Sequence, residues 1–96
     1  MRFETRLKES EEWGVKPQLD KATQTAAGLA LAVSQYDERR ESPMSSSSAA
    51  ASRLLRQMLE CSVMINQLKL ILDITDESWD DMYSLEVDEI KRQGYL

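Results

Sequence analysis

Three carboxylates near the C-terminus come closest, by type and spacing, to a site for chemistry. Asp76 and Asp80 are separated by about one turn of a helix, and Asp81 follows directly. Carboxylate oxygens are the ligands that Ca²⁺ and Mg²⁺ prefer, but these acids lack the alternating order and the central glycine of an EF-hand loop. The pattern therefore favours a solvated acidic helix face over a metal site, and it implies no cofactor.

The other reactive residue types do not form a catalytic set. The sequence contains no histidine, so it lacks the usual base for a serine nucleophile and the usual zinc ligand. It also contains no glycine-rich loop of the kind that binds phosphates. Cys61 is the only cysteine, and its place in a helical pattern of apolar residues predicts a small buried side chain rather than a reactive thiol. We therefore expect a protein that is not an enzyme and that acts by binding.

The strongest pattern in the chain is an unbroken heptad of apolar residues over positions 51–72. Steps of three and four place these side chains on one seam of a helix, as in helices packed lengthwise against each other. Leu55 and Leu59 widen the seam on one flank, and Met64 and Ile71 widen it on the other. A face this broad predicts a bundle or a higher oligomer. The predicted oligomer interface consists of Leu54, Met58, Cys61, Ile65, Leu68 and Leu72.

The periodicity of the whole chain predicts an all-α fold built on a helical hairpin with short flanking helices. Two helices are expected over residues 18–38 and 47–72, joined by a loop over 37–48 in which a serine caps the second helix. A third helix is expected to start at Thr75 or Asp76 and to end near Gly94. The predicted divisions are an N-terminal arm or short helix (1–14), a hairpin core (15–72) and an acidic C-terminal helix (73–96).

Charge is distributed unevenly along the 96 residues, whose formal net charge is −5. The net negative charge comes from residues 73–96, which hold eight acidic and two basic residues, whereas residues 1–72 hold nine acidic and ten basic residues. A chain that is acidic overall is not an obvious nucleic-acid binder. The basic residues are concentrated near the expected hairpin loop. If a ring of subunits repeated them, they would form a positively charged rim able to contact DNA backbone. The candidate DNA contacts are Arg39, Arg40, Arg53 and Arg56.

The acidic C-terminal segment also contains aromatic residues, a combination typical of helices that dock on basic grooves. Charge speeds the encounter with such a partner, and aromatic side chains anchor the complex. The candidate docking residues are Trp79, Asp80, Asp81 and Tyr83. The alternative is that Trp79 and Tyr83 simply pack on helices of their own chain.

Hydropathy gives no sign of a membrane protein. No stretch approaches 18 apolar residues, and the first twelve residues are too charged for a signal peptide. A cytoplasmic location is therefore expected.

The middle of the chain resembles a known family. Residues 29–41 read Leu-Ala-Leu-Ala-Val-Ser-Gln-Tyr-Asp-Glu-Arg-Arg-Glu, and after a Ser/Ala-rich run residues 52–60 read Ser-Arg-Leu-Leu-Arg-Gln-Met-Leu-Glu. Over residues 22–60 this order resembles the small terminase subunits of phages of actinobacteria. Their second helix often carries a Leu-Arg-x-x-Leu pattern, which Leu55, Arg56 and Leu59 match. The resemblance implies a ring-forming DNA-packaging component that recognises phage DNA and delivers it to the large terminase subunit.

Two functions follow as expectations. The first is a non-enzymatic homo-oligomeric adaptor for phage DNA packaging, of the small-terminase type, in the cytoplasm of a bacterial host cell. The alternative is a small acidic helical protein that binds a basic host or phage protein through residues 73–96 and inhibits or adapts it. A third interpretation is an accessory subunit whose Ala-rich first helix packs on a larger enzyme.

Overall fold

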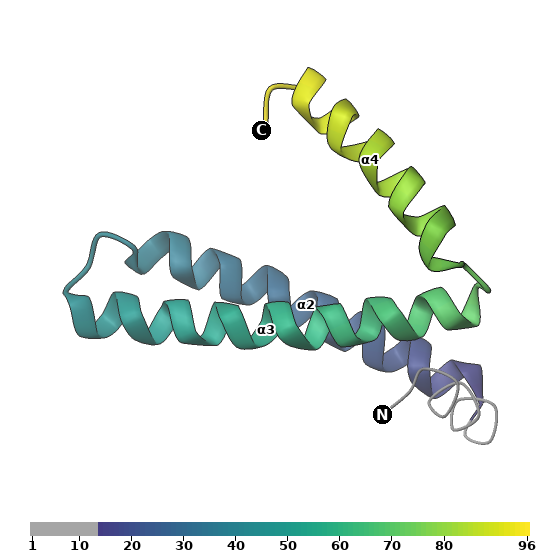
Figure 1. The fold of residues 1–96 in the computed structure, drawn as a ribbon. Helices are drawn as coiled ribbons and strands as arrows, with labels where there is room; N and C mark the ends of the chain where they lie inside the picture. The colour runs from purple at the N-terminus through teal and green to yellow at the C-terminus, as the bar shows by residue number, and fades with distance from the viewer. Residues whose placement is uncertain (1–13) are drawn as a thin grey trace.

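A computed structural model describes residues 14–96 as three helices connected by short turns (Figure 1). Helix α2 spans Val15–Arg39, α3 spans Met44–Ile71 and α4 spans Asp76–Arg92. No strand occurs in this part of the chain, and the predicted all-α class is confirmed. The N-terminal arm or short helix predicted for residues 1–14 lies outside the described residues, apart from Gly14.

Helices α2 and α3 lie side by side and run in opposite directions, and we call them the α2–α3 pair (Figure 1). The turn between them is shorter than the predicted loop, because α2 continues to Arg39 and α3 begins at Met44. The expected serine cap is wrong, since the N-cap residue is Pro43 and no side chain caps this end. Pro43 has a fixed φ of −49°, which lets the helix start before the serines are reached.

The serine-rich run belongs to the first turns of α3 instead of the loop. The carbonyl oxygen of Pro43 accepts hydrogen bonds from the backbone N–H groups of Ser46 and Ser47, at 2.9 and 3.1 Å. The hydroxyl of Ser47 donates to the carbonyl oxygen of Met44 at 3.1 Å, so it is satisfied within the helix. The three alanines at 49–51 then favour continuation of the helix.

The core of the α2–α3 pair is made of small and polar side chains. The buried residues are Thr25, Ala32, Ala50, Met64 and Gln67, and no large side chain among residues 14–96 is fully buried. The side chain of Gln57 of α3 covers Gly28 of α2 so closely that a Cβ atom at Gly28 would lie 2.5 Å from its Oε1. Close approach brings the backbones together but leaves many larger apolar side chains at the surface.

Helix α4 leaves the end of α3 through a left-handed turn. Asp73 has a φ of 56°, and the N–H of Ile74 donates to the carbonyl oxygen of Lys69 at 2.8 Å, as in a Schellman motif. Thr75 then caps α4, because its hydroxyl oxygen accepts from the N–H of Ser78 at 3.1 Å. Gly94, with a φ of 86°, ends α4 as the sequence predicts.

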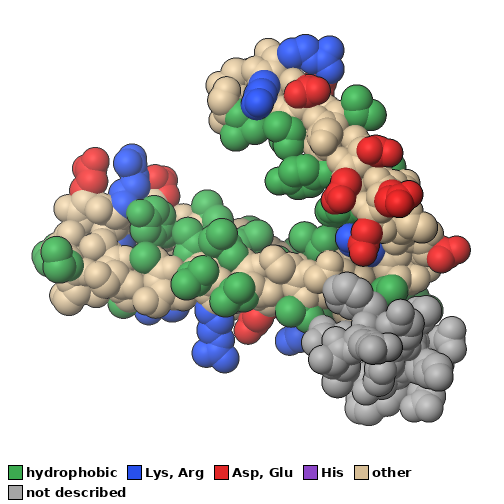
Figure 2. All heavy atoms as spheres, viewed as in Figure 1, with side chains coloured by type: hydrophobic (Ala, Val, Ile, Leu, Met, Phe, Trp, Pro, Cys, Tyr) green, Lys and Arg blue, Asp and Glu red, His purple; other side chains and the backbone are tan. Residues whose placement is uncertain are grey.

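Helix α4 does not pack along the α2–α3 pair. It rises away from the end of α3 (Figure 1), and the only helix–helix packing among the described elements is between α2 and α3. No residue of α4 is buried. The three helices therefore leave an open hollow between α4 and the α2–α3 pair, visible in Figure 2.

Candidate functional site

The side of the α2–α3 pair that faces α4 is apolar (Figure 2). Two heptad stripes lie next to each other on this side, and we call them together the concave face. From α2 it contains Ala22, Ala26 and Leu29, which line a groove with α3, and by helix periodicity the same stripe of α2 includes Val15, Leu19, Val33 and Tyr36. From α3 it contains the predicted interface residues Leu54, Met58, Cys61, Ile65, Leu68 and Leu72.

A groove of about 250 Å³ runs between the two stripes. Ala22 and Ala26 of α2 are its small residues, and Ile65 and Leu68 of α3 line the opposite side. Cys61 also lines it, with Sγ donating to the backbone carbonyl of Thr25 at 3.6 Å. Cys61 is half-buried, and its small side chain packs between the two helices.

The predicted interface residues fall into two groups. Leu54, Cys61 and Leu68 are half-buried beside α2. The alternate positions remain open, with Met58 exposed by 51%, Ile65 by 42% and Leu72 by 67%. The deeply buried α3 residues belong to a neighbouring stripe of the helix. The packing of α3 on α2 therefore uses only part of the apolar surface that the heptad provides.

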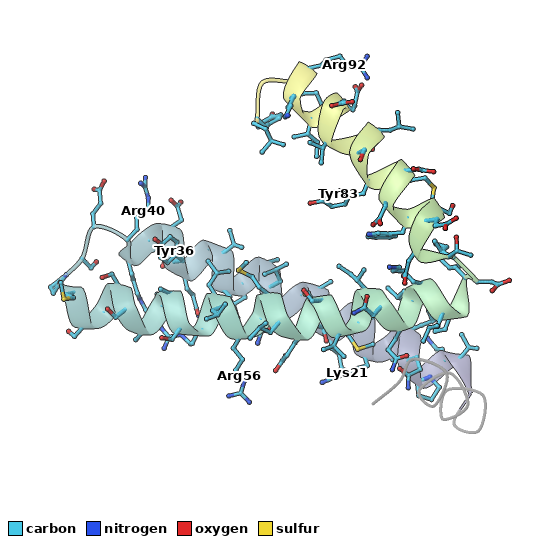
Figure 3. The ribbon with its side chains drawn as sticks, in the orientation of Figure 1. Lys21, Tyr36, Arg40, Arg56, Tyr83 and Arg92 are labelled. Atoms are coloured by element: carbon cyan, nitrogen blue, oxygen red, sulfur yellow. The ribbon has the colours of Figure 1, made fainter. Side chains whose placement is uncertain are left out.

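Helix α4 presents a second apolar surface toward the hollow. Its apolar residues recur at steps of three and four, and Tyr83, exposed by 60%, points into the hollow (Figure 3). The acidic side chains lie mainly on the outer side of the helix (Figure 2). We call the inner surface the α4 face. Its apolar residues are Trp79, Met82, Tyr83, Val87 and Ile90, and Glu86 lies among them.

The predicted docking residues are thereby divided between two sides of α4. Trp79 and Tyr83 belong to the α4 face. Asp81 is two residues from each of them, about half a helical turn, so it projects from the opposite side of the helix. Asp80 projects sideways, between the α4 face and the side of Asp81. The aromatic anchors and the acids of this segment do not form one continuous docking surface.

One basic residue fixes the first turn of α4 against α3. The side chain of Lys69 is only 14% exposed, and its Nζ donates to Oδ1 of Asp76 at 3.2 Å. The same ammonium group lies 4.8 Å from the centre of the Trp79 ring, a cation–π contact. Trp79 thus packs on its own chain, whereas Tyr83 one turn further does not. The sequence carries a signal for this contact, because Lys69 is the only basic residue between Arg56 and Lys91.

The candidate DNA-contact arginines do not gather in one cluster. Arg40 and Arg56 project from opposite sides of the α2–α3 pair (Figure 3). Arg40 pairs with Asp37 at 3.1 Å, and Arg39 is half-buried at the end of α2. Arg53 and Arg56 lie together on the side away from the concave face, so a single four-arginine surface is not formed within one subunit.

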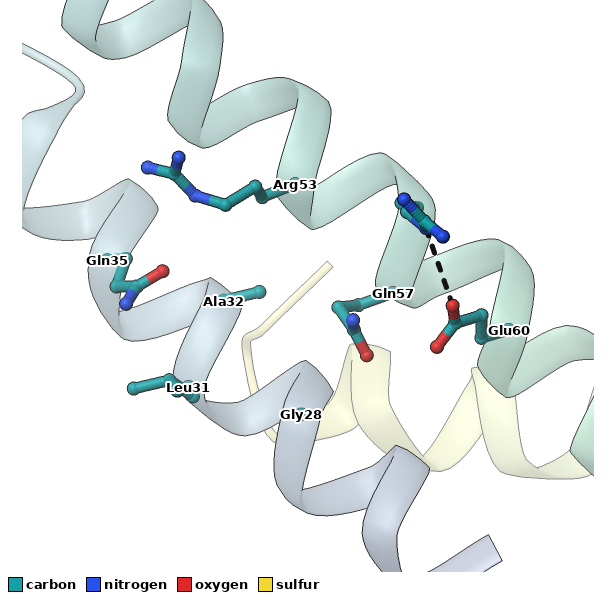
Figure 4. Close-up of a pocket in the computed structure, with 8 residues that line it drawn as sticks. Gly28, Leu31, Ala32, Gln35, Arg53, Gln57 and Glu60 are labelled. Carbon is teal, nitrogen blue, oxygen red and sulfur yellow. Dashed lines mark ion pairs between the residues drawn. The ribbon is translucent and has the colours of Figure 1, made fainter. Parts of the chain in front are cut away.

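Arg53 and Arg56 border a polar groove of about 520 Å³ (Figure 4). The amide of Gln57 reaches over Gly28 into this groove, and Arg56 pairs with Glu60 across 3.6 Å. Arg53 makes no ion pair with any described residue. Its guanidinium group is therefore available to an anionic partner. The lining of the groove is Gly28, Leu31, Ala32, Gln35, Arg53, Arg56, Gln57 and Glu60.

Residues 14–96 contain neither a cluster of metal ligands nor a membrane-spanning helix. No three carboxylate or thiol groups of these residues, including Asp76, Asp80 and Asp81, come together as a set able to hold a metal ion. None of the three helices combines the length and the apolar composition that a membrane crossing needs.

Comparison of the chain with protein-family models, with curated proteins and with solved structures finds no match. The functional interpretation therefore rests on the surfaces just described and on the resemblance in sequence.

Proposed function

We propose that this chain is a non-enzymatic homo-oligomeric interaction protein whose concave face is the interface between subunits. One observation supports this most strongly: large apolar side chains are exposed on the concave face, while Met64 is the only large apolar side chain buried among residues 14–96. Fully burying a side chain such as Met58, Ile65 or Leu72 contributes roughly 1.5–3 kcal/mol. Such burial in an assembly would supply the stability that a small monomer lacks.

The particular role that fits best is a phage DNA-packaging adaptor of the small-terminase type. The sequence resemblance over residues 22–60 covers most of α2, the turn and the first half of α3. The polar groove with Arg53 lies away from the concave face, so it stays accessible when that face is covered. Helical hairpins repeated around a ring would present one such groove per subunit to phage DNA. The large terminase subunit would be the protein partner.

DNA binding tests this role. Arg53→Glu/Arg56→Glu is expected to weaken affinity for duplex DNA about tenfold or more, because each arginine contacts a phosphate. The affinity of the unmodified chain should fall steeply between 50 and 200 mM salt, and the double variant should show a shallower salt slope, measured by fluorescence anisotropy.

The control is Arg40→Glu, which replaces a positive charge by a negative one on the other side of the α2–α3 pair. It is expected to change the DNA affinity by much less. An oligomer that does not bind duplex DNA even at low salt would overturn the DNA-packaging role and leave the proposed assembly in place.

A second candidate function is supported by the outer side of α4. Asp80, Asp81 and Asp88 form no ion pair with any described residue, whereas Asp76 and Glu89 of the same helix are paired with Lys69 and Arg92. Unpaired acids on an exposed helix fit the groove of a basic protein. This function requires tight binding of a basic protein partner that is lost when Asp80 and Asp81 are changed to Asn.

A further inference from the structure

We infer that α4 of one copy docks in the groove between α2 and α3 of a second copy. The inference rests on the proposed homo-oligomer and names the two surfaces through which its subunits make contact. Beyond its first turn, where Trp79 contacts Lys69, the α4 face has no partner among the described residues, because α4 does not pack lengthwise on α2 or α3 and none of its residues is buried. The concave face is equally open, with Ile65 exposed by 42% at the edge of the groove.

The two surfaces match in pattern and size. Both carry apolar residues at steps of three and four, which is the pattern of helices packed lengthwise. Helix α4 has 17 residues and is about 25 Å long, and α3, with 28 residues, is longer. Ala22 and Ala26 leave room in the groove for bulky side chains such as Tyr83 and Ile90. A third helix in this groove would complete a bundle.

Net charge favours contact of α4 with an α2–α3 pair over contact between two α4 helices or between two α2–α3 pairs. Residues 14–72 contain seven basic and five acidic residues, whereas residues 73–96 contain eight acidic and two basic residues. Two acidic α4 helices would repel each other, and so would two basic pairs. The net charges of α4 and the pair are opposite, so they favour the encounter at long range, while the contact itself is apolar.

The turn between α3 and α4, at Asp73, directs α4 away from the groove of its own chain. Asp73 turns the chain in the left-handed conformation, and Lys69 holds both Asp76 and Trp79 at the start of α4. The α4 face is therefore held open toward a neighbour. Docking of each α4 on the next subunit is a head-to-tail contact, which with more than two copies closes into a ring.

Mixing two defective full-length chains tests the inference. Met58→Asp damages the groove and Tyr83→Asp damages the α4 face, and both residues are exposed in the single subunit. Each variant alone is expected to be monomeric by light scattering. An equimolar mixture is expected to form a species of two chains, because the intact α4 of the first variant enters the intact groove of the second. Circular dichroism confirms that each variant remains helical.

A mixture of two groove variants, Met58→Asp and Ile65→Asp, is the matched control and should stay monomeric. Ile65→Asp also replaces Met58→Asp if the latter loses its helical signal. A mixture that stays monomeric, while the unmodified chain is oligomeric, overturns docking of α4 and leaves the homo-oligomer standing. Contact between two concave faces would leave Tyr83→Asp oligomeric by itself, and contact between two α4 helices would leave Met58→Asp oligomeric by itself. Either of these results also overturns docking of α4 on the groove. A monomeric unmodified chain would overturn the proposed function as well.

Discussion

Replacing Ile65 by Asp is expected to dissociate the oligomer into chains of 11.0 kDa. Ile65 lies on the concave face and is 42% exposed in the single subunit, so the new carboxylate remains solvated in the monomer. In the assembly the same carboxylate would be buried without a partner, at a cost of several kcal/mol. The expected loss is about 100-fold or more in the affinity between subunits, measured by light scattering across a dilution series.

Leu59→Asp is the matched control for Ile65→Asp. Leu59 is an aliphatic residue of the same helix, is 59% exposed and lies outside the concave face. Its replacement is expected to leave the molar mass unchanged. Leu68, also on the seam, is less suitable because α2 already half-buries it. An unchanged mass for Ile65→Asp, or dissociation by Leu59→Asp, would contradict the assignment of the concave face as the interface.

Replacing Ala50 by Leu is expected to lower the free energy of unfolding by about 1–3 kcal/mol. Ala50 is only 1% exposed and belongs to the side of α3 that packs on α2. The three extra carbon atoms have no space there, so the helices must move apart or the side chain must adopt a strained rotamer. Urea unfolding followed by circular dichroism, at one fixed protein concentration, measures the change.

Ala49→Leu is the control for this substitution. Ala49 precedes Ala50 in the same helix and is exposed, so the larger side chain meets solvent. Both substitutions exchange one good helix former for another, which removes helix propensity from the comparison. Equal unfolding midpoints for the two variants would show that Ala50 is not at a close contact between α2 and α3.

Periodicity predicted the helices well because it reports directly on which side chains share a face. The heptad over residues 51–72 falls within one helix apart from its last residue, and the Ala-rich stripe of residues 19–36 falls within another. Capping chemistry was equally informative for α4, where Thr75 and Gly94 mark the two ends. These signals are local, so a single sequence is sufficient to show them.

Features that depend on neighbours in space were not predicted. Serine is a common capping residue, but at 45–48 the preceding Pro43 and the following alanines extend the helix through the serines. The division of the arginines between two sides depends on which face of α3 packs on α2, and the heptad allowed more than one choice. The contact of Lys69 with Trp79 depends on the direction in which α4 leaves α3.

The surfaces of the chain are segregated in a way that suits an adaptor. Apolar side chains line the concave face and the α4 face, the polar groove with Arg53 lies on the far side of the α2–α3 pair, and acids cover the outer side of α4 (Figures 2 and 4). Assembly through the apolar surfaces would leave both charged surfaces accessible. The proposed DNA contact and the alternative docking of a basic protein would therefore use different faces.

The absolute molar mass of the unmodified chain, measured by light scattering after size exclusion at two salt concentrations, tests the proposed assembly most directly. The expected result is one discrete species larger than a dimer of the 11.0 kDa chain at both salt concentrations, because the contacts between subunits are mainly apolar. A mass of 11.0 kDa at every protein concentration and at both salt concentrations would contradict it.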